Sequence, residues 1–84
     1  MTPHTLTVYS TPTCAPCRAV KKRLDRDGIL YVAVDLTEDA EALERIKASL
    51  GTPTVSTPLF RWRSEYLDLS HLPRIIREAQ GAEL

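Results

Sequence analysis

The chain has 84 residues, of which 43% are apolar, enough for one small domain and too few for two with separate cores. Its 11 basic residues balance its 11 acidic ones, so no net charge points to nucleic acid or to an anionic membrane surface. No apolar run could span a bilayer, and residues 1–5 contain no signal-peptide core. These features predict one domain over residues 1–84, a cytoplasmic location, no nucleic-acid or membrane partner, and no need for more than a monomer.

The first part of the chain alternates between strand-like and helix-like segments. In order, these are a strand at residues 6–10, a helix at 17–27, a strand at 31–36 and a helix at 38–50. Gly28 and Gly51 suit the ends of the two helices, and Thr37 is the predicted N-cap of the second. The buried stripe of that helix is predicted to be Leu43, Ile46 and Leu50. This order favours two parallel strands joined by a right-handed crossover.

After Pro53 the pattern predicts a hairpin and a last helix. The two strands are placed at residues 54–57 and 60–66, with only Pro58-Leu59 between them. Arg61 and Arg63 alternate with apolar residues, which is typical of an edge strand. Ser70 is the predicted N-cap of the last helix, and residues 80–84 are predicted to fray. The inward face of that helix is predicted to be Leu72, Ile75, Ile76 and Ala79.

Cys14 and Cys17 are separated by two residues at the predicted junction of the first strand and helix. A bridge across so short a loop stabilises a fold little, so this spacing indicates a dithiol redox centre. A sulfur at a helix N-terminus meets unpaired N–H groups and the positive end of the helix dipole, which favour the thiolate. Cys14 is therefore the predicted nucleophile, and Cys17 the partner that resolves the mixed disulfide.

Several residues near the cysteines have both a structural and a functional interpretation. A basic cluster follows the pair, either as a solvated helix face or as a source of positive potential that helps an acidic partner dock; it comprises Arg18, Lys21, Lys22, Arg23 and Arg26. Pro16 can start the helix, limit backbone freedom at the dithiol, or both. Asp35 can accept a proton through water near Cys17, although a capping contact is more common at a strand end.

The aromatic residues and histidines are also open to two interpretations. Trp62 and Tyr9 suit packing at the sheet more than recognition of a partner. His4 and His71 lack the spacing of metal ligands, and there is no second C-x-x-C motif. A zinc site or a pair of inert buried thiols is therefore the weaker interpretation of the cysteines.

The element order, the C-x-x-C position and a Thr-Pro before the third strand resemble the thioredoxin fold in its glutaredoxin-like form. The resemblance rests on Val8 to Cys17, Gly28 to Leu36, Thr52-Pro53, Trp62 and Pro73-Arg74-Ile75. It implies an α/β fold of order β-α-β-α-β-β-α, with a four-stranded mixed sheet flanked by three helices. It also implies that Thr52-Pro53 is the cis-proline dipeptide, in which the backbone of the residue before the proline pairs with an extended substrate. From the residues alone, the other Thr-Pro bonds compete for the cis assignment: Thr2-Pro3, Thr11-Pro12 and Thr57-Pro58.

Within that group the chain looks most like the NrdH-redoxins, which reduce ribonucleotide reductase and are recharged by thioredoxin reductase. Trp62 to Tyr66 matches their tryptophan-serine-glycine-aromatic stretch only in part, and Ala15-Pro16 looks more like the glycine-proline of thioredoxins. The glycine-glycine and paired-aspartate segment that holds glutathione in glutaredoxins is missing between Glu65 and His71.

The resemblance thus implies a dithiol electron carrier with no bound cofactor, whose electrons come from NADPH through a flavoprotein reductase. Its reduction potential is expected between about −200 and −270 mV. The alternative within the redox class is a glutaredoxin that depends on glutathione or another low-molecular-weight thiol. The alternative from another class is a non-catalytic metal-binding or interaction domain.

Overall fold

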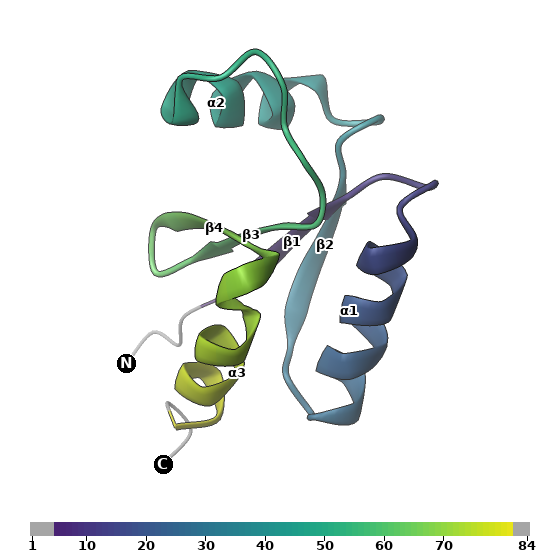
Figure 1. The fold of residues 1–84 in the computed structure, drawn as a ribbon, viewed down its shortest axis with the longest axis vertical. Coiled ribbons are helices and arrows are strands. Elements are labelled where there is room, and N and C mark those ends of the chain that lie inside the picture. The colour runs from purple at the N-terminus through teal and green to yellow at the C-terminus, as the bar shows by residue number, and fades with distance from the viewer. Residues whose placement is uncertain (1–4, 82–84) are drawn as a thin grey trace.

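The computed structural model describes residues 5–81, which form a mixed sheet covered by helices on both faces (Figure 1). The strands are β1 (Leu6–Ser10), β2 (Tyr31–Asp35), β3 (Leu59–Trp62) and β4 (Glu65–Asp68). The helices are α1 (Ala15–Arg26), α2 (Ala40–Leu50) and α3 (Leu72–Gly81), with a 3₁₀ turn, η1 (Leu69–His71), before the last. The predicted element order and fold class are confirmed. No helix within residues 5–81 is long and apolar enough to cross a membrane.

The four strands lie in the order β2-β1-β3-β4. β1 is parallel to β2 and antiparallel to β3, and β3 is antiparallel to β4. A parallel pair needs a crossover connection, which α1 supplies between β1 and β2. β1 thus lies inside the sheet, and Val8 pairs with Ala33 on one side and Phe60 on the other.

Each sheet face has its own apolar core, because successive side chains of a strand point to opposite faces. In Figure 1, α1 and α3 lie below the sheet and α2 lies above it. The larger core gathers residues of the sheet, α1, α3 and nearby connections: Leu6, Val8, Val20, Leu24, Ile29, Phe60, Trp62, Leu67, Leu72, Ile75 and Ile76. The smaller core, on the α2 side, comprises Tyr9, Leu36, Ala42, Ile46 and Leu59. The predicted inward residues of the last helix are confirmed, with Ala79 packed at the margin.

The start of α2 differs from the prediction, because Asp39 and not Thr37 is its N-cap. The Asp39 carboxylate accepts a hydrogen bond of 3.0 Å from the N–H of Ala42. Thr37 instead donates its N–H and hydroxyl to Asp35, at 2.8 and 2.6 Å. The buried stripe is also shifted: Leu50, in the last turn, is 45% exposed, whereas Ile46 is fully buried.

The predicted hairpin is wrong in its position. Residues 54–57 are loop, and the hairpin joins β3 to β4 through Arg63 and Ser64, which have φ of +51° and +67°. Two successive residues with positive φ are the geometry of a type I′ turn, which is usually signalled by Asn-Gly. This turn lacks that signal. Since β4 pairs with β3, Arg61 lies on an interior strand, and the edge strands are β2 and β4.

The last helix also begins and ends differently from the prediction. Asp68, and not Ser70, caps the turn η1 that leads into it, accepting a hydrogen bond of 3.1 Å from the N–H of Ser70. α3 continues through Gln80 and Gly81, so these two residues do not belong to a frayed tail. Residues 82–84, the rest of the predicted tail, lie outside the described residues, as does His4.

Candidate active site: the Cys14–Cys17 pair

Cys14 is the N-cap of α1 and is joined to Cys17 by a disulfide. Its backbone is extended (φ −90°, ψ 102°), and its Sγ accepts a hydrogen bond of 3.1 Å from the N–H of Cys17. Pro16 lies in the first turn, where a missing N–H removes no helical hydrogen bond. The helix begins at Ala15, two residues before the predicted start. The Sγ of Cys14 takes the place of the side-chain oxygen that usually caps a helix.

The two cysteine residues differ in their exposure to solvent. Cys14 is 9% exposed and Cys17 is 1% exposed, while Thr13, Ala15 and Pro16 around them are exposed. The Cys14 N–H donates to the carbonyl of Thr11 at 3.2 Å, which closes the loop between β1 and α1. An attacking thiolate therefore meets Cys14 at the surface of the loop, and Cys17 is the sulfur behind it.

The N-terminus of α1 is the positive end of the helix dipole, and the first turn carries no acidic residue to offset it. Arg18 donates to the carbonyl of Pro12 at 3.4 Å, and Lys21 donates to the hydroxyl of Ser10 at 3.1 Å. The other charged partners lie at the far end of α1, where Arg23 and Arg26 lie 3.8 and 3.5 Å from Asp27. Only part of the basic cluster is thus held close to the site.

Asp35 makes a turn contact at the end of β2. The hydrogen bonds from the hydroxyl and N–H of Thr37 lower the pKa of Asp35, and the Lys21 charge contributes less. Its carboxylate therefore stays ionised at neutral pH. This is the capping interpretation of Asp35; no hydrogen bond links it to Cys17 among the described residues.

Among residues 5–81 the cis peptide bond lies at Thr57–Pro58, so its predicted place at Thr52–Pro53 is wrong. The pairing of strands shows where this bond lies in the fold. Tyr9 pairs with Leu59, which sets Pro58 beside the end of β1, from which the cysteine loop departs. Thr52 follows the end of α2, where its N–H donates to the carbonyl of Lys47. The substrate-binding role of Thr52 and Pro53 stays a prediction.

The supporting aromatic residues are part of the cores. Trp62 is 3% exposed, and its indole N–H donates to Glu78 at 2.8 Å. Tyr9 is 6% exposed, its ring lies 6.2 Å from that of Tyr66, and burial raises its pKa. Both positions agree with the packing interpretation.

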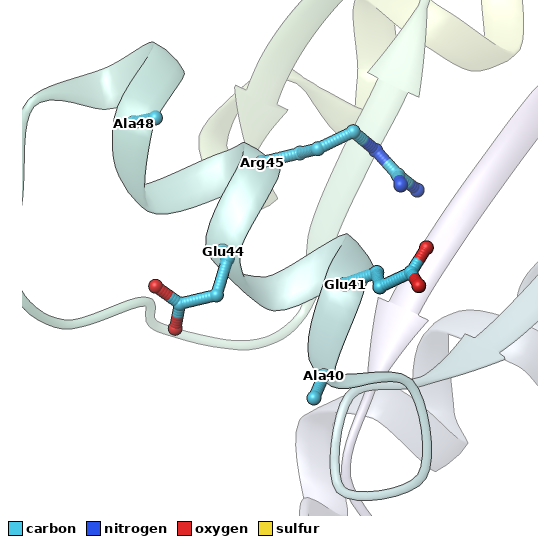
Figure 2. Close-up of a pocket in the computed structure, with 5 residues that line it drawn as sticks. All are labelled: Ala40, Glu41, Glu44, Arg45 and Ala48. Atoms are coloured by element: carbon cyan, nitrogen blue, oxygen red, sulfur yellow. The ribbon is translucent and has the colours of Figure 1, made fainter.

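Away from the cysteines, the described residues form no second site with converging side chains. Residues 5–81 contain no group of three or more His, Cys, Asp or Glu side chains placed to hold a metal ion. A shallow depression on the outer surface of α2 is lined by Ala40, Glu41, Glu44, Arg45 and Ala48, and Figure 2 shows the Glu44 carboxylate pointing away from Glu41 and Arg45. Its side chains do not converge, and α2 covers the sheet face opposite α1.

Two side-chain contacts were not predicted from the sequence. One is the hydrogen bond between Lys21 and Ser10, which joins α1 to the end of β1. The sequence did offer one indication: Lys21 follows Cys17 by four residues, which places both residues on one side of a helix. The other is the pair of hydrogen bonds that Ser70 donates to Asp68. An acidic residue two positions before Ser70 could have indicated this cap.

Comparisons with known proteins agree with this geometry. A family model for glutaredoxin matches residues 6–55. The chain is 34% identical over 70 residues to the gene 56 protein of Mycobacterium phage L5, which covers 75% of this chain and 68% of that protein. It is 38% identical over 50 residues to the gene 56 protein of Mycobacterium phage D29, which covers 60% of this chain and 56% of that protein.

Two solved structures share the fold. The thioredoxin-like protein BC3987 superposes with a TM-score of 0.71 at 27% identity, covering 84% of this chain and 99% of that chain. The glutaredoxin-like NrdH-redoxin from Escherichia coli superposes with a TM-score of 0.72 at 19% identity, covering 87% of this chain and 92% of that chain. At 19% identity the second likeness concerns the fold alone.

Proposed function

The chain belongs to the glutaredoxin family, and from that membership we propose that it is an NrdH-like electron carrier recharged by thioredoxin reductase. It is a thiol–disulfide oxidoreductase whose redox centre is the Cys14–Cys17 disulfide. The proposed targets are disulfides in other proteins of the cytoplasm, ribonucleotide reductase among them. The electrons come ultimately from NADPH through the flavoprotein reductase, and the carrier acts as a monomer.

The proposed cycle uses the two sulfur atoms in sequence. The Cys14 thiolate attacks one sulfur of the target disulfide, and the other target sulfur leaves with the electron pair of the broken bond. Cys17 then attacks Cys14 in the mixed disulfide, so the target leaves as a dithiol and Cys14–Cys17 is the oxidised product. The positive end of α1 favours the Cys14 thiolate, since its sulfur accepts the N–H of Cys17.

The single observation that supports thioredoxin reductase over glutathione is the position of Asp68. Glutathione-dependent relatives hold their ligand with a glycine-glycine and paired-aspartate segment, and this chain has β4 and η1 there. The Asp68 carboxylate accepts the N–H of Ser70 at 3.1 Å and lies 2.9 Å from Nδ1 of His71. Hydrogen bonds from Ser70, and then from His71, lower the pKa of Asp68. An ionised side chain thus occupies the N–H of Ser70, which would otherwise be open to a carboxylate of glutathione.

We propose the loop between α2 and β3 as the docking segment for the target. It contains both Thr52-Pro53 and Thr57-Pro58. Its end lies beside β1, because Tyr9 pairs with Leu59. An extended target chain could pair with the backbone of this loop as an added strand.

A two-reductase assay tests the proposal. The oxidised protein is mixed with NADPH and either thioredoxin reductase or glutathione with glutathione reductase, and NADPH oxidation is followed with a protein disulfide as the final acceptor. We expect turnover with thioredoxin reductase and little with the glutathione system. Turnover with glutathione alone would instead assign the protein to the glutathione-dependent glutaredoxins. A non-catalytic domain would be supported if neither system gave turnover and if dithiothreitol, used as the direct reductant, gave no reduction of the acceptor disulfide.

A further inference from the structure

We propose that Lys21 is a positioning residue that stabilises the thiolate of Cys17 when the Cys14–Cys17 disulfide is broken. This role belongs to the opening of the Cys14–Cys17 disulfide. It does not depend on which reductase recharges the protein, so it is tested separately from the proposed electron-carrier role.

The geometry places Lys21 on the same side of α1 as the buried Cys17. Lys21 follows Cys17 by four residues in α1, so the two lie one above the other on one side of the helix. The ammonium is held there by a hydrogen bond of 3.1 Å to the hydroxyl of Ser10. Ser10 is the last residue of β1 and is 4% exposed. Its side chain has the same parity on the strand as Val8, which belongs to the core beneath α1.

A charge that forms on Cys17 needs such a partner. Cys17 is 1% exposed, so water can contribute little to the stability of its thiolate, and a buried charge without a partner is costly. The neighbouring cations are placed differently: Arg18 bonds to the carbonyl of Pro12, and Lys22 is exposed. Lys21 is therefore the cation of the basic cluster that is anchored to the buried end of β1.

The acidic group that pairs with Ser10 across the sheet makes no ion pair within 4.0 Å with Lys21. Asp35 pairs with Ser10 in the register of β1 and β2, and its carboxylate feels the Lys21 charge. Its hydrogen bonds are made to Thr37, at 2.8 and 2.6 Å. No ion pair within 4.0 Å joins Lys21 to a carboxylate of residues 5–81. The loop at residues 52–58 and strand β3 up to Phe60 add no titratable side chain.

The step that Lys21 serves is the opening of the disulfide. The thiolate of a reductant attacks Sγ of Cys14 and forms a mixed disulfide with it. The Cys14–Cys17 bond breaks, and its electron pair leaves on Cys17 as a thiolate, which later takes a proton from solvent. The reductant's second thiol then releases Cys14, so one disulfide is reduced and one dithiol is oxidised. A better-stabilised leaving thiolate raises the rate of the first step.

The test compares single-turnover reduction of the oxidised protein by dithiothreitol, followed by trapping of the free thiols, in variants of Lys21 and Lys22. Lys21→Met removes the charge and keeps an apolar stem, while Lys22→Met makes the same change at the adjacent exposed position. We expect Lys21→Met to slow reduction about tenfold, as the loss of a nearby opposite charge predicts. Lys22→Met should change the rate by less than about twofold, because its charge is screened by solvent.

Two more variants separate the charge from the shape of the side chain. Lys21→Arg keeps a cation and should restore most of the rate. Lys21→Gln keeps a polar group for Ser10 without the charge and should be as slow as Lys21→Met. It also provides a neutral variant if Lys21→Met does not fold. Far-UV circular dichroism checks the fold of each variant. The proposal is overturned if a folded neutral variant reacts as fast as Lys22→Met, or if Lys21→Arg is as slow as Lys21→Gln.

Discussion

The indole N–H of Trp62 donates a hydrogen bond of 2.8 Å to Oε1 of Glu78 and so connects β3 to α3. Arg63 lies 3.8 Å from the same oxygen, and Arg74 lies 3.9 Å from the other. The guanidinium of Arg63 also lies over the Trp62 ring, 5.4 Å from its centre. This arrangement holds the hairpin turn and the last helix together on the α3 side of the sheet.

The Trp62–Glu78 contact predicts a loss of stability in acid. The hydrogen bond from Trp62, and then the charges of Arg63 and Arg74, lower the pKa of Glu78 below its ordinary value of 4.5. A depressed carboxylate pKa contributes stability above the unfolded value, and this contribution is lost as the pH falls through the folded value. Urea unfolding between pH 7 and pH 3, followed by the fluorescence of the single tryptophan, should show this loss.

The matched variants for this prediction are Glu78→Gln and Glu65→Gln. Glu78→Gln should be less stable than the parent at pH 7 and should lose less stability on acidification. Glu65→Gln changes an exposed glutamate on β4 and should keep the acid dependence of the parent. Parallel curves for Glu78→Gln and the parent would show that this carboxylate does not contribute to the acid effect.

The two cysteines should have different roles in disulfide exchange. Cys14→Ser should abolish disulfide reduction without unfolding the domain, because the attacking sulfur is lost and a hydroxyl can still cap α1. Cys17→Ser should accumulate a mixed disulfide between Cys14 and the target, because the resolving sulfur is lost. Non-reducing electrophoresis with mass spectrometry detects that adduct. Full activity in Cys14→Ser would contradict the redox assignment.

The two apolar positions of α2 should differ in their effect on stability. Ile46 is fully buried and Leu50 is 45% exposed. Ile46→Ala should lower the free energy of unfolding by about 2–5 kcal/mol, through lost burial and the cavity that remains. Leu50→Ala should change it by less than about 0.5 kcal/mol. Equal losses in urea denaturation would mean that Leu50 belongs to the core beneath α2.

Removal of the Asp68 carboxylate should make the protein more responsive to glutathione. Asp68→Ala frees the N–H of Ser70 and removes a negative charge from the start of the last helix. The rate with glutathione and glutathione reductase should rise several-fold relative to the parent. Asp39→Ala is the matched control, because it removes the N-cap of α2 and should destabilise the protein without raising that rate. No rise in Asp68→Ala would show that Asp68 does not exclude glutathione.

Residues with strong local preferences allowed much of the fold to be predicted. Gly28 and Gly51 end the first two helices with φ of +71° and +64°, a conformation that glycine adopts without strain. The apolar periodicity located the elements in the right order, and the C-x-x-C motif located the dithiol at the start of α1. The local chemistry at Cys14 could be expected because a helix N-terminus presents the same unpaired N–H groups in any fold.

Other features depended on contacts between segments that are distant in the sequence. The hairpin turn uses Arg63 and Ser64, whose side chains do not favour positive φ, and it forms because β4 completes the sheet beside β3. The pairing of Tyr9 with Leu59, which are 50 residues apart, determines that Pro58 lies beside the end of β1. Likewise, Lys21 meets Ser10 only because α1 packs against β1. The sequence alone thus determined the order of elements and the reactive pair, through backbone preference and periodicity. The tertiary structure decided that Pro58 lies beside the end of β1 and that Lys21 meets Ser10, because strand pairing and helix packing bring these residues together.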